Sequence, residues 1–547
     1  MIMNKLIFLL LSCFVSLKLS AQISVDVFSQ NDSIEAGDTI SSQTGDTFSY
    51  LSQESFIEID PMASFSRSYG VYLRGAPNSS HKYFVDGHDM EDITGIARTA
   101  RMDLNVSSPL DKTQISLGPQ GVGFGPGASA GVFSNRSSKK SYHFFRLNNH
   151  LGTSFVSQKN DTKLSYRVAG EFIDSPSVFP QGEEKDSNIK IDLRTWIESK
   201  YGSSSLLYVQ NNQDYDELSA DSFTNSSSFK KISFLHKDKW FSSNFKREIS
   251  YKTGLQLTNR EENFSNKTEN YSAQTLTAQF KNAGEKSEYL VRGKLERYGE
   301  MENLTGENNI RPMMDLSSSL FFKETFIDTA GISVSITNDN EVIPSLEFSK
   351  SIDNLKLKVS SSGRLPSYYE LYSSFGNENL KPQKTFSGDL FFENSNLRLS
   401  AFIQEYKNFI NYDFFNNRYE NIDHLMSYGA EASIKYLRLF DIGLSYKRMK
   451  SLISEKILPG RNTFTTSMIL RPWRGVNLIY RGVFGRYGFN EEKLNSLHFV
   501  SLDYGFNLSK NEKITVSGKN LLNEKSNSLF PTQNGGVVTQ LDYIYLL

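Results

Sequence analysis

Three short apolar runs follow one another in this chain: Tyr69-Gly-Val-Tyr-Leu-Arg-Gly75, Tyr83-Phe-Val-Asp-Gly87 and Ile115-Ser-Leu-Gly118. Each run ends in a turn that contains glycine, and runs of β-branched and aromatic residues bounded by such turns predict strands. A glycine series follows at positions 118, 121, 123, 125, 127 and 131. Glycine at this density predicts a backbone that turns repeatedly and packs closely against another surface. Residues 69–132 are therefore predicted to form a small strand-rich body, which on this stretch alone could be a soluble domain.

Downstream of residue 140, apolar and polar residues alternate. Leu164-Ser-Tyr-Arg-Val-Ala-Gly-Glu-Phe172 places apolar residues and glycine at even numbers, and Leu355–Ser360 and Val500–Leu508 alternate in the same way. Such strands present one face to lipid and the other to water. A soluble antiparallel sandwich alternates as well. However, a sandwich needs a second sheet for each apolar face and rarely continues over 407 residues (547 − 140) without a domain break.

The composition agrees with a membrane barrel built from strands. Hydrophobic residues make up 38% of the chain, yet aromatic residues reach 13%, with 27 Tyr and 40 Phe. A barrel needs apolar residues only at alternate positions and carries aromatic girdles at both membrane interfaces. After the N-terminal segment, no apolar run approaches the roughly 18 residues of a membrane helix. The formal net charge is -1, which gives no indication of a nucleic-acid partner.

The N-terminal segment has the features of a secretory signal peptide over residues 1–21. Lys5 precedes the apolar run Leu6–Val15, and Ser20-Ala21 provides a small-residue cleavage site. A lipoprotein signal that uses Cys13 is the alternative. Cys13 is the only cysteine, so cleavage after Ala21 leaves a chain without disulfides, thiol catalysis or cysteine-bound metal. Residues 22–46 are polar and are predicted to form an extended arm.

The order of these motifs resembles the plug of TonB-dependent outer-membrane receptors. A second block, Gly363-Arg-Leu-Pro-Ser-Tyr-Tyr-Glu-Leu-Tyr372 followed by Gly376-Asn-Glu-Asn-Leu-Lys-Pro382, resembles the barrel signature of the same family, with Gln383 in place of the usual Glu. The chain is identified as a member of this family and resembles the cobalamin-receptor-like branch weakly. The plug motif falls on Arg74, Gly75, Asp86, Gly87, Gly118, Gly123, Gly125, Gly127 and Gly131. The barrel motif falls on Arg364, Pro366, Glu370, Leu371, Asn377, Leu380 and Pro382.

The resemblance implies an all-β transmembrane barrel with a small α+β plug domain in its lumen. About 22 antiparallel strands are expected, which leaves about 18 residues for each strand and its connection. The implied domains are a signal peptide (1–21), a periplasmic arm (22–46), a plug (47–140) and a barrel (141–547). In this family the arm carries a TonB box. Two candidates exist, Asp38-Thr-Ile40 and the preferred stretch of five residues with alternating β-branched side chains, Ile23, Ser24, Val25, Asp26 and Val27.

The function implied by the resemblance is energised uptake of a scarce, bulky solute, either cobalamin or a ferric siderophore. The implied location is the bacterial cell outer membrane, with its lipid and the TonB-ExbB-ExbD complex as partners and without a cofactor. The candidate ligand-facing parts of the plug are Asp89–Arg98 and the loop formed by Ala76, Pro77, Asn78, Ser79, Ser80 and His81. Arg74 would be buried inside the barrel and would need a carboxylate partner on the inner wall, which the sequence does not identify.

Other functions find less support in the sequence. Asp86, Asp89, Glu91 and Asp92 lack the Asp-x-Asp-x-Asp-Gly order of a calcium loop, so a turn with solvated carboxylates is the favoured interpretation and no metal site is predicted. The His-Glu-x-x-His pattern of zinc proteases is also missing. We therefore predict that the chain is not an enzyme. The remaining alternatives are a passive porin-like or adhesin barrel and a barrel enzyme such as a lipase.

Overall fold

The computed structural model describes residues 38–41, 57–59 and 71–547. Within the last range the gaps are 96, 150–151, 162, 177–184, 200–201, 218–219, 243–246, 265–266, 285–286, 302–309, 322–326, 338–341, 414–415, 423, 437–438, 452–456, 487–492, 494 and 525–536. The predicted signal peptide and the TonB box candidate Ile23–Val27 lie outside the described residues. Among the described residues, no helix is both long enough and apolar enough to cross a bilayer.

A small mixed sheet forms the plug. Its strand order is β1-β6-β7-β4-β5, with β4 and β7 parallel and the other neighbours antiparallel. The strands are β1 (Asp38–Ser41), β4 (His81–Val85), β5 (His88–Asp89), β6 (Lys112–Leu117) and β7 (Gly131–Arg136). A separate pair joins β2 (Ile57–Ile59) to β3 (Val71–Leu73), and the short helices are η1 (Asn78–Ser80), η2 (Met102–Leu104) and α3 (Gly121–Phe124). The three apolar runs predicted to be strands lie in β3, β4 and β6, which confirms that prediction.

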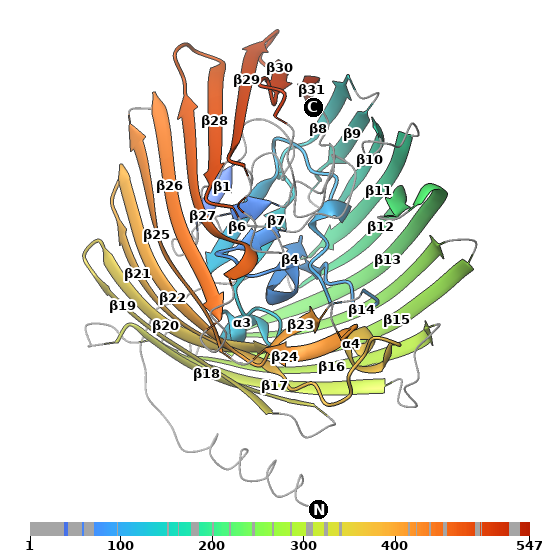
Figure 1. Cartoon of the computed structure of the whole chain (residues 1–547), viewed down its shortest axis with the longest axis vertical. Coiled ribbons are helices and arrows are strands. Elements are labelled where there is room, and N and C mark those ends of the chain that lie inside the picture. Colours follow the sequence, from blue (N-terminus) through green and yellow to red (C-terminus); the bar gives the residue numbers. More distant parts are fainter. Residues whose placement is uncertain are drawn as a thin grey trace, which may run out of the picture.

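A closed antiparallel barrel surrounds this body, and Figure 1 shows the blue plug strands enclosed by the ring of barrel strands. Within the described residues the barrel has 22 strands, as predicted. They are β8 (Tyr142–Asn148), β9 (Thr153–Lys159), β10 (Leu164–Pro176), β11 (Lys185–Glu198), β12 (Gly202–Glu217), β13 (Ala220–Ser242), β14 (Arg247–Phe264), β15 (Lys267–Ala283), β16 (Ser287–Met301), β17 (Ile310–Phe321), β18 (Thr329–Thr337), β19 (Val342–Ile352), β20 (Leu355–Arg364), β21 (Gln383–Glu393), β22 (Leu397–Lys407), β25 (Leu425–Tyr436), β26 (Phe440–Ser451), β27 (Ile457–Leu470), β28 (Val476–Phe484), β29 (Leu497–Asn507), β30 (Glu512–Lys519) and β31 (Val538–Leu546).

The last strand closes the barrel against the first. β31 pairs antiparallel with β8, so that Leu546 lies opposite Tyr142 and Gln540 opposite Asn148. An ion pair joins the same two strands, because Arg146 Nε donates to Asp542 Oδ1 at 2.9 Å and both side chains are buried. Closure leaves no free edge, and a spanning sheet in hydrocarbon requires this because every backbone group must be paired.

Alternation in the sequence becomes an apolar outer face and a polar inner face. On β10, Leu164, Val168 and Phe172 are exposed on the outside, while Ser165 and Arg167 are buried inside. An outer face of this kind is suited to lipid. The inner face needs polar partners, and the plug supplies many of them.

The two ends of the barrel differ in their connections. One end carries the long connections 365–382 and 408–424, which contain α4 (Tyr368–Tyr372) and the hairpin of β23 (Phe409–Asp413) and β24 (Arg418–Ile422). The other end has short turns such as 353–354 and 394–396. We call these ends the long-loop rim and the short-turn rim. In outer-membrane barrels the long loops are extracellular and the short turns periplasmic.

Gly131 offers a test of how tightly the plug is packed. A Cβ added there would lie 2.5 Å from both Leu73 Cδ2 and the Ser116 carbonyl oxygen, whereas a Cβ at Gly123 meets nothing within 4 Å. We expect Gly131→Ala to destabilise the plug by about 1–3 kcal/mol and to raise amide hydrogen exchange in β6. Gly123→Ala is the matched control and should leave exchange unchanged. Equal exchange in the two variants would contradict the packing described here.

Candidate functional site

Arg74 joins the plug to the inner wall of the barrel at β21 and β25. It follows β3, is 1% exposed and has a positive φ of 54°. Its Nε and Nη2 donate to the two carboxylate oxygens of Glu431 at 3.0 and 3.1 Å, and Nη1 donates to Asp389. Burial alone would lower the pKa of Arg74, but Glu431 and Asp389 raise it above its usual value. The guanidinium therefore stays charged, and these two residues are the barrel carboxylates that the sequence could not identify.

The Asp86-Gly87 turn makes a second connection between plug and barrel. Asp86 and Gly87 have φ values of 48° and 85°, which the turn between β4 and β5 requires. The Asp86 carboxylate accepts from the backbone N–H and hydroxyl of Ser137 at 2.8 and 2.7 Å and from Arg194 Nη1 at 2.8 Å. Burial would raise the pKa of Asp86, but Arg194 and Ser137 lower it below its ordinary value. The aspartate in this motif therefore shapes a turn and also binds a barrel arginine.

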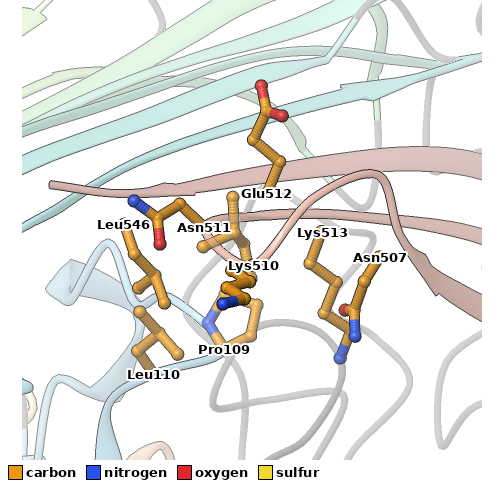
Figure 2. A pocket seen from close by; sticks show the side chains of 9 residues that line it. Pro109, Leu110, Asn507, Lys510, Asn511, Glu512, Lys513 and Leu546 are labelled. Carbon is orange, nitrogen blue, oxygen red and sulfur yellow. The ribbon is translucent and has the colours of Figure 1, made fainter.

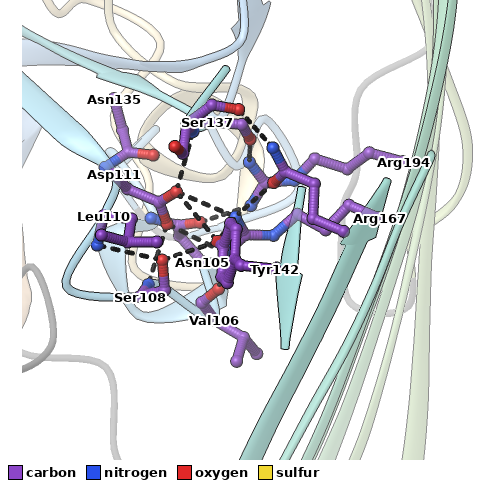
Figure 3. Close-up of polar contacts among 12 residues, drawn as sticks. Asn105, Val106, Ser108, Leu110, Asp111, Asn135, Ser137, Tyr142, Arg167 and Arg194 are labelled. Atoms are coloured by element: carbon purple, nitrogen blue, oxygen red, sulfur yellow. Dashed lines mark hydrogen bonds and ion pairs between the residues drawn. The ribbon is translucent and has the colours of Figure 1, made fainter. Parts of the chain in front are cut away.

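A third contact lies between Asp111 and Arg167 and is shown in Figure 3. Arg167 Nη1 and Nη2 donate to the two oxygens of Asp111 at 2.9 and 3.0 Å, and Nη1 also donates to the Tyr142 hydroxyl at 3.1 Å. Nη2 donates to the Val106 carbonyl at 2.5 Å. Two-pronged arginine–carboxylate contacts fix both distance and orientation. This contact therefore sets the position of the plug segment 106–111 relative to β8 and β10.

The acidic residues between Asp86 and Asp92 are paired with cations, whereas the sequence predicted that solvent surrounds them. Lys82 Nζ lies 3.4 Å from Asp89, and Arg98 lies 2.9 Å from Glu91 and 2.7 Å from Glu296. Burial would raise the pKa of Glu91, but Arg98 and Lys294 hold it well below its usual value. The interpretation as solvated carboxylates is wrong, because the fold places these groups between plug and barrel where cations neutralise them. Among the described residues, no three His, Cys, Asp or Glu side chains form a metal site.

Two plug histidines, His81 and His88, are buried. The His88 ring nitrogens lie 2.8 Å from the Ser233 hydroxyl and 3.0 Å from the Ser205 hydroxyl, both on the barrel wall. The His81 ring stands edge-on to Phe133, with 5.0 Å between ring centroids. Burial lowers the pKa of each imidazole to about 3. Both rings are therefore uncharged at neutral pH.

The predicted ligand-facing loops have different surroundings. Ala76, Ser80 and His81 are buried, Pro77 and Ser79 are half-buried, and Asn78 begins η1. In the other loop, Ile93 packs with Tyr298 and Tyr368 of the barrel. Contact of either loop with ligand stays a prediction.

The glycines of the plug motif allow unusual backbone geometry or close contact. Gly75 packs against Met449. Gly118, Gly125 and Gly127 have positive φ values between 74° and 94°, and Gly123 lies in α3. A Cβ at Gly118 would lie 2.9 Å from an Asp389 carboxylate oxygen. Gly118 therefore lies beside Asp389, a partner of Arg74.

Ser129 lies in Gly127-Ala-Ser-Ala-Gly131, which matches the Gly-x-Ser-x-Gly pattern of many hydrolases. A catalytic serine of that kind sits exposed on a turn between a strand and a helix. Ser129 is instead fully buried, donates its hydroxyl to the Ser80 carbonyl at 3.1 Å and precedes β7. This geometry does not support nucleophilic chemistry at Ser129.

The barrel motif forms a rigid corner at the long-loop rim. Arg364 ends β20 and donates to both carboxylate oxygens of Glu370 at 2.9 and 3.1 Å. Glu370 in turn forms a capping box with Ser367 at the start of α4. The Pro366 carbonyl accepts from Arg311 at 2.7 Å. Farther along, Asn377 donates to the Tyr419 carbonyl at 3.0 Å, Leu380 packs with Leu371 and Tyr419, and the Pro382 carbonyl accepts from Asn408 at 3.5 Å.

Aromatic side chains gather on this corner. The Tyr298 and Tyr368 rings stack with centroids 4.4 Å apart, and Tyr372 lies 4.7 Å from Tyr368. A second group on the same connections consists of Tyr369, Phe375, Tyr412 and Tyr419. We call these seven residues the aromatic rim. It lies above the plug loop that contains Ile93 and provides apolar ring faces together with hydroxyl groups.

The short-turn rim holds a cavity of about 250 Å³, shown in Figure 2. Pro109 and Leu110 of the plug line it together with Lys510, Glu512 and Lys513 near the start of β30. It lies at the opposite end of the barrel from the aromatic rim and shares no residue with it.

Sequence reasoning missed most of the residues that hold the plug. Asp111, Arg167, Arg194, Asp389 and Glu296 stand in ordinary strand or loop contexts, and their partners are far away in sequence. The available signal was an ionisable residue at an inward position of an alternating run, such as Arg167 between Tyr166 and Val168.

Comparison with known proteins adds three observations. Residues 123–521 match the family model described as TonB dependent receptor-like, beta-barrel. No curated protein matches the chain. Solved structures have the same fold, as three examples show. A mutant ferric enterobactin receptor of Pseudomonas aeruginosa in complex with enterobactin has a TM-score of 0.68 and 14% identity, and the match covers 92% of this chain and 97% of that chain. The copper transporter OprC has a TM-score of 0.72 and 13% identity, with coverage of 93% and 100%, and the siderophore receptor PirA of Acinetobacter baumannii has a TM-score of 0.69 and 14% identity, with coverage of 94% and 98%.

Removing the Arg74 charge should loosen the plug. Arg74→Met leaves Asp389 and Glu431 buried without a counter-charge, which destabilises a folded protein by about 3–5 kcal/mol. We expect a lower urea midpoint for loss of hydrogen-exchange protection in β3 and β4. Adding Asp389→Asn and Glu431→Gln should recover much of the loss. Lys112→Met removes an exposed plug cation and should change little, so a loss of the same size in this control would contradict the assignment.

Acid should weaken the plug in two steps. The pKa values of His81 and His88 are lowered from 6.5 to about 3, so the contribution of each to stability is complete above pH 6.5 and is lost as pH falls toward 3. For each of these histidines, every pH unit below 6.5 lowers the free energy of unfolding by up to about 1.4 kcal/mol. Asp86 and Glu91 have lowered pKa values, so their contributions are lost only below about pH 4.

Hydrogen exchange of the β4–β5 turn, corrected for intrinsic rates, measures this effect. In His88→Gln, protection should fall less between pH 6.5 and about 4.5 than in the unmodified chain. The exposed residue His424 provides the control variant His424→Gln. An unchanged slope in His88→Gln would show that His88 does not contribute to the first step.

Proposed function

The chain belongs to the TonB-dependent receptor family, and we propose from this that it takes up a ferric siderophore across the bacterial outer membrane with energy from TonB. Structural neighbours of the family are transport receptors, among them receptors for ferric enterobactin and for a siderophore. They share 12% to 14% identity with this chain, so their ligands are a guide to solute class and not to the solute itself.

The aromatic rim is the observation that carries this proposal. Ring faces such as those of the half-buried Tyr369, Tyr372 and Tyr412 are suited to pack against planar or aromatic groups, and tyrosine hydroxyls are suited to bind polar substituents. Many siderophores combine aromatic or flat iron-binding groups with polar ones. Cobalamin is the second candidate because its broad corrin plane would pack on the same surface. A passive porin is less well supported, since the plug fills the centre of the barrel (Figure 1).

Coupling to TonB would act through the arm that precedes the plug. The arm would add a strand to TonB, as exposed segments with alternating β-branched residues do. Tension on the arm would then be resisted by the ion pairs of Arg74, Asp86 and Asp111 with the barrel wall. Ligand capture and plug displacement are therefore separate steps that separate variants can test.

Uptake of radioactive iron in a strain that depends on this receptor tests the proposal. Iron-loaded enterobactin, an iron-loaded hydroxamate and labelled cobalamin are offered in parallel, with and without TonB. We expect accumulation of one iron complex only when TonB is present. Deletion of residues 23–27 should abolish this accumulation and leave surface binding intact, while deletion of 31–35 serves as the length-matched control. TonB-independent entry, or entry of none of these solutes, would contradict the proposal.

A further inference from the structure

The inner wall of the barrel has a region rich in charged side chains and a region rich in hydroxyl groups. On β10–β16 the buried inward residues include Arg167, Arg194, Lys231 and Glu296. On β18–β21 hydroxyl groups predominate among the buried inward residues, and the buried charges there, Lys358, Arg364 and Asp389, are each paired with an opposite charge. We call these hydroxyl-bearing residues the hydroxyl wall, which consists of Ser333, Ser335, Ser345, Ser360, Ser362 and Thr385. The contrast is one of chemistry, since both regions face the same plug.

The hydroxyl wall contains buried polar atoms that the described residues leave without a hydrogen bond. The side-chain oxygens of Ser335, Ser360, Ser362 and Thr385 have no partner, and each of these residues is 1% or 2% exposed. Both amide atoms of the neighbouring Gln383 are also unpartnered. Buried polar atoms in proteins are almost always bonded to protein or to water. This wall is therefore suited to receive polar groups that are not part of the chain.

A glycine-rich loop of the plug covers the hydroxyl wall. Its helix α3 packs against β17–β20. Ser333 Oγ donates to the Gly121 carbonyl at 3.3 Å, and the Gly127 N–H donates to the Gly363 carbonyl at 2.8 Å. A Cβ at Gly121 would lie only 2.3 Å from Ser345 Oγ, so the backbone itself closes this side. The ion pairs between plug and barrel go to β10, β11, β16, β21 and β25, so β21 is the strand that contributes both to the hydroxyl wall and to an ion pair with the plug.

The loop is built so that it can move independently of the plug sheet. The Gln120 N–H donates to the Ala128 carbonyl at 2.8 Å, which brings the two ends of the loop together. Between these ends, Gly125 and Gly127 have positive φ values of 74° and 94°. Val122 and Phe124 are its buried apolar anchors, and the Phe124 ring lies 5.5 Å from that of Phe84. Displacing this loop breaks the packing of Val122 and Phe124 and the hydrogen bonds that join Gly121, Gly123 and Gly127 to the barrel, and leaves the ion pairs intact.

We propose that residues 121–127 are the movable part of the plug and that the hydroxyl wall lines the solute path opened by their displacement. The inference rests on the proposed uptake function. Hydroxyl groups both donate and accept, so such a path binds uncharged hydrogen-bonding groups of a solute in many orientations. Its charged neighbours Lys358 and Asp389 are paired with Glu347 and Arg74, so the path has no unpaired charge that would hold a passing ion tightly.

Excision of the loop tests this proposal without a ligand or TonB, so its failure is distinct from failure of the uptake function. Because Gln120 and Ala128 are adjacent, two glycines can replace residues 121–127. In planar bilayers the unmodified receptor should stay closed. The excised variant should conduct, with a potassium-to-chloride permeability ratio of about one. A closed variant, or a pore strongly selective for one sign of ion, would overturn the proposal.

A matched excision beside the charged wall provides the control. Two glycines replace residues 94–98, whose ends are joined by the bond from the Asp92 N–H to the Thr99 carbonyl at 2.9 Å. This variant should stay closed or form a smaller, ion-selective pore. An equally large and unselective pore would overturn the proposal, because the path would then not be specific to the hydroxyl wall.

Point variants locate the path within the excised background. Ser335→Asp or Ser360→Asp should raise the permeability ratio several-fold toward potassium, whereas Thr258→Asp on the inner face of β14 should not. Equal effects of the three would contradict the assignment. Heat-modifiable migration on gels verifies barrel folding in each variant. If the excised chain does not fold, the same measurements are made in Val122→Gly/Phe124→Ala, which keeps the chain length and removes both apolar anchors.

Discussion

The plug stays in the lumen because charges buried between it and the barrel neutralise one another. Arg74, Asp86 and Asp111 each have an opposite charge on the wall within hydrogen-bonding distance. An unpaired charge in this place would be strongly unfavourable, whereas a paired one gives little net stability over an apolar contact. Such pairs therefore specify where the plug sits more than they strengthen it. The backbone turns of the plug follow from this requirement, since Arg74 and Asp86 both adopt positive φ values that direct their side chains to the wall.

Local patterns in the sequence predicted the elements but not their contacts. Alternation in runs such as Leu164–Phe172 is a property of neighbouring residues, so it predicted the barrel and its apolar outer face. The partners of Arg74 lie 315 and 357 positions away, and no local pattern contains such a relation. The acidic series was misjudged for the same reason. Burial of Glu91 depends on Lys294 and Glu296 from a distant strand, while its own neighbours are typical of an exposed turn.

The distribution of chemistry inside the barrel suggests a division of tasks. Ion pairs to β10, β11, β16, β21 and β25 position the plug, the corner of Arg364 and Glu370 supports the aromatic rim, and the hydroxyl wall faces the glycine-rich loop. Each task uses the groups suited to it. Ion pairs give position, aromatic rings give adaptable contact area, and hydroxyls give hydrogen bonds without charge.

The seam between β8 and β31 also constrains how the molecule is made. Arg146 and Asp542 are separated by 396 positions, so the first barrel strand leaves the ribosome long before its partner exists. Until β31 has been synthesised, one edge of β8 is unpaired and Arg146 lacks its partner Asp542. Contacts of such long range form slowly and leave sticky edges exposed. Biogenesis therefore needs an escort that shields the nascent N-terminal strands, and a chain that stops short of β31 would reach the bilayer as an open sheet.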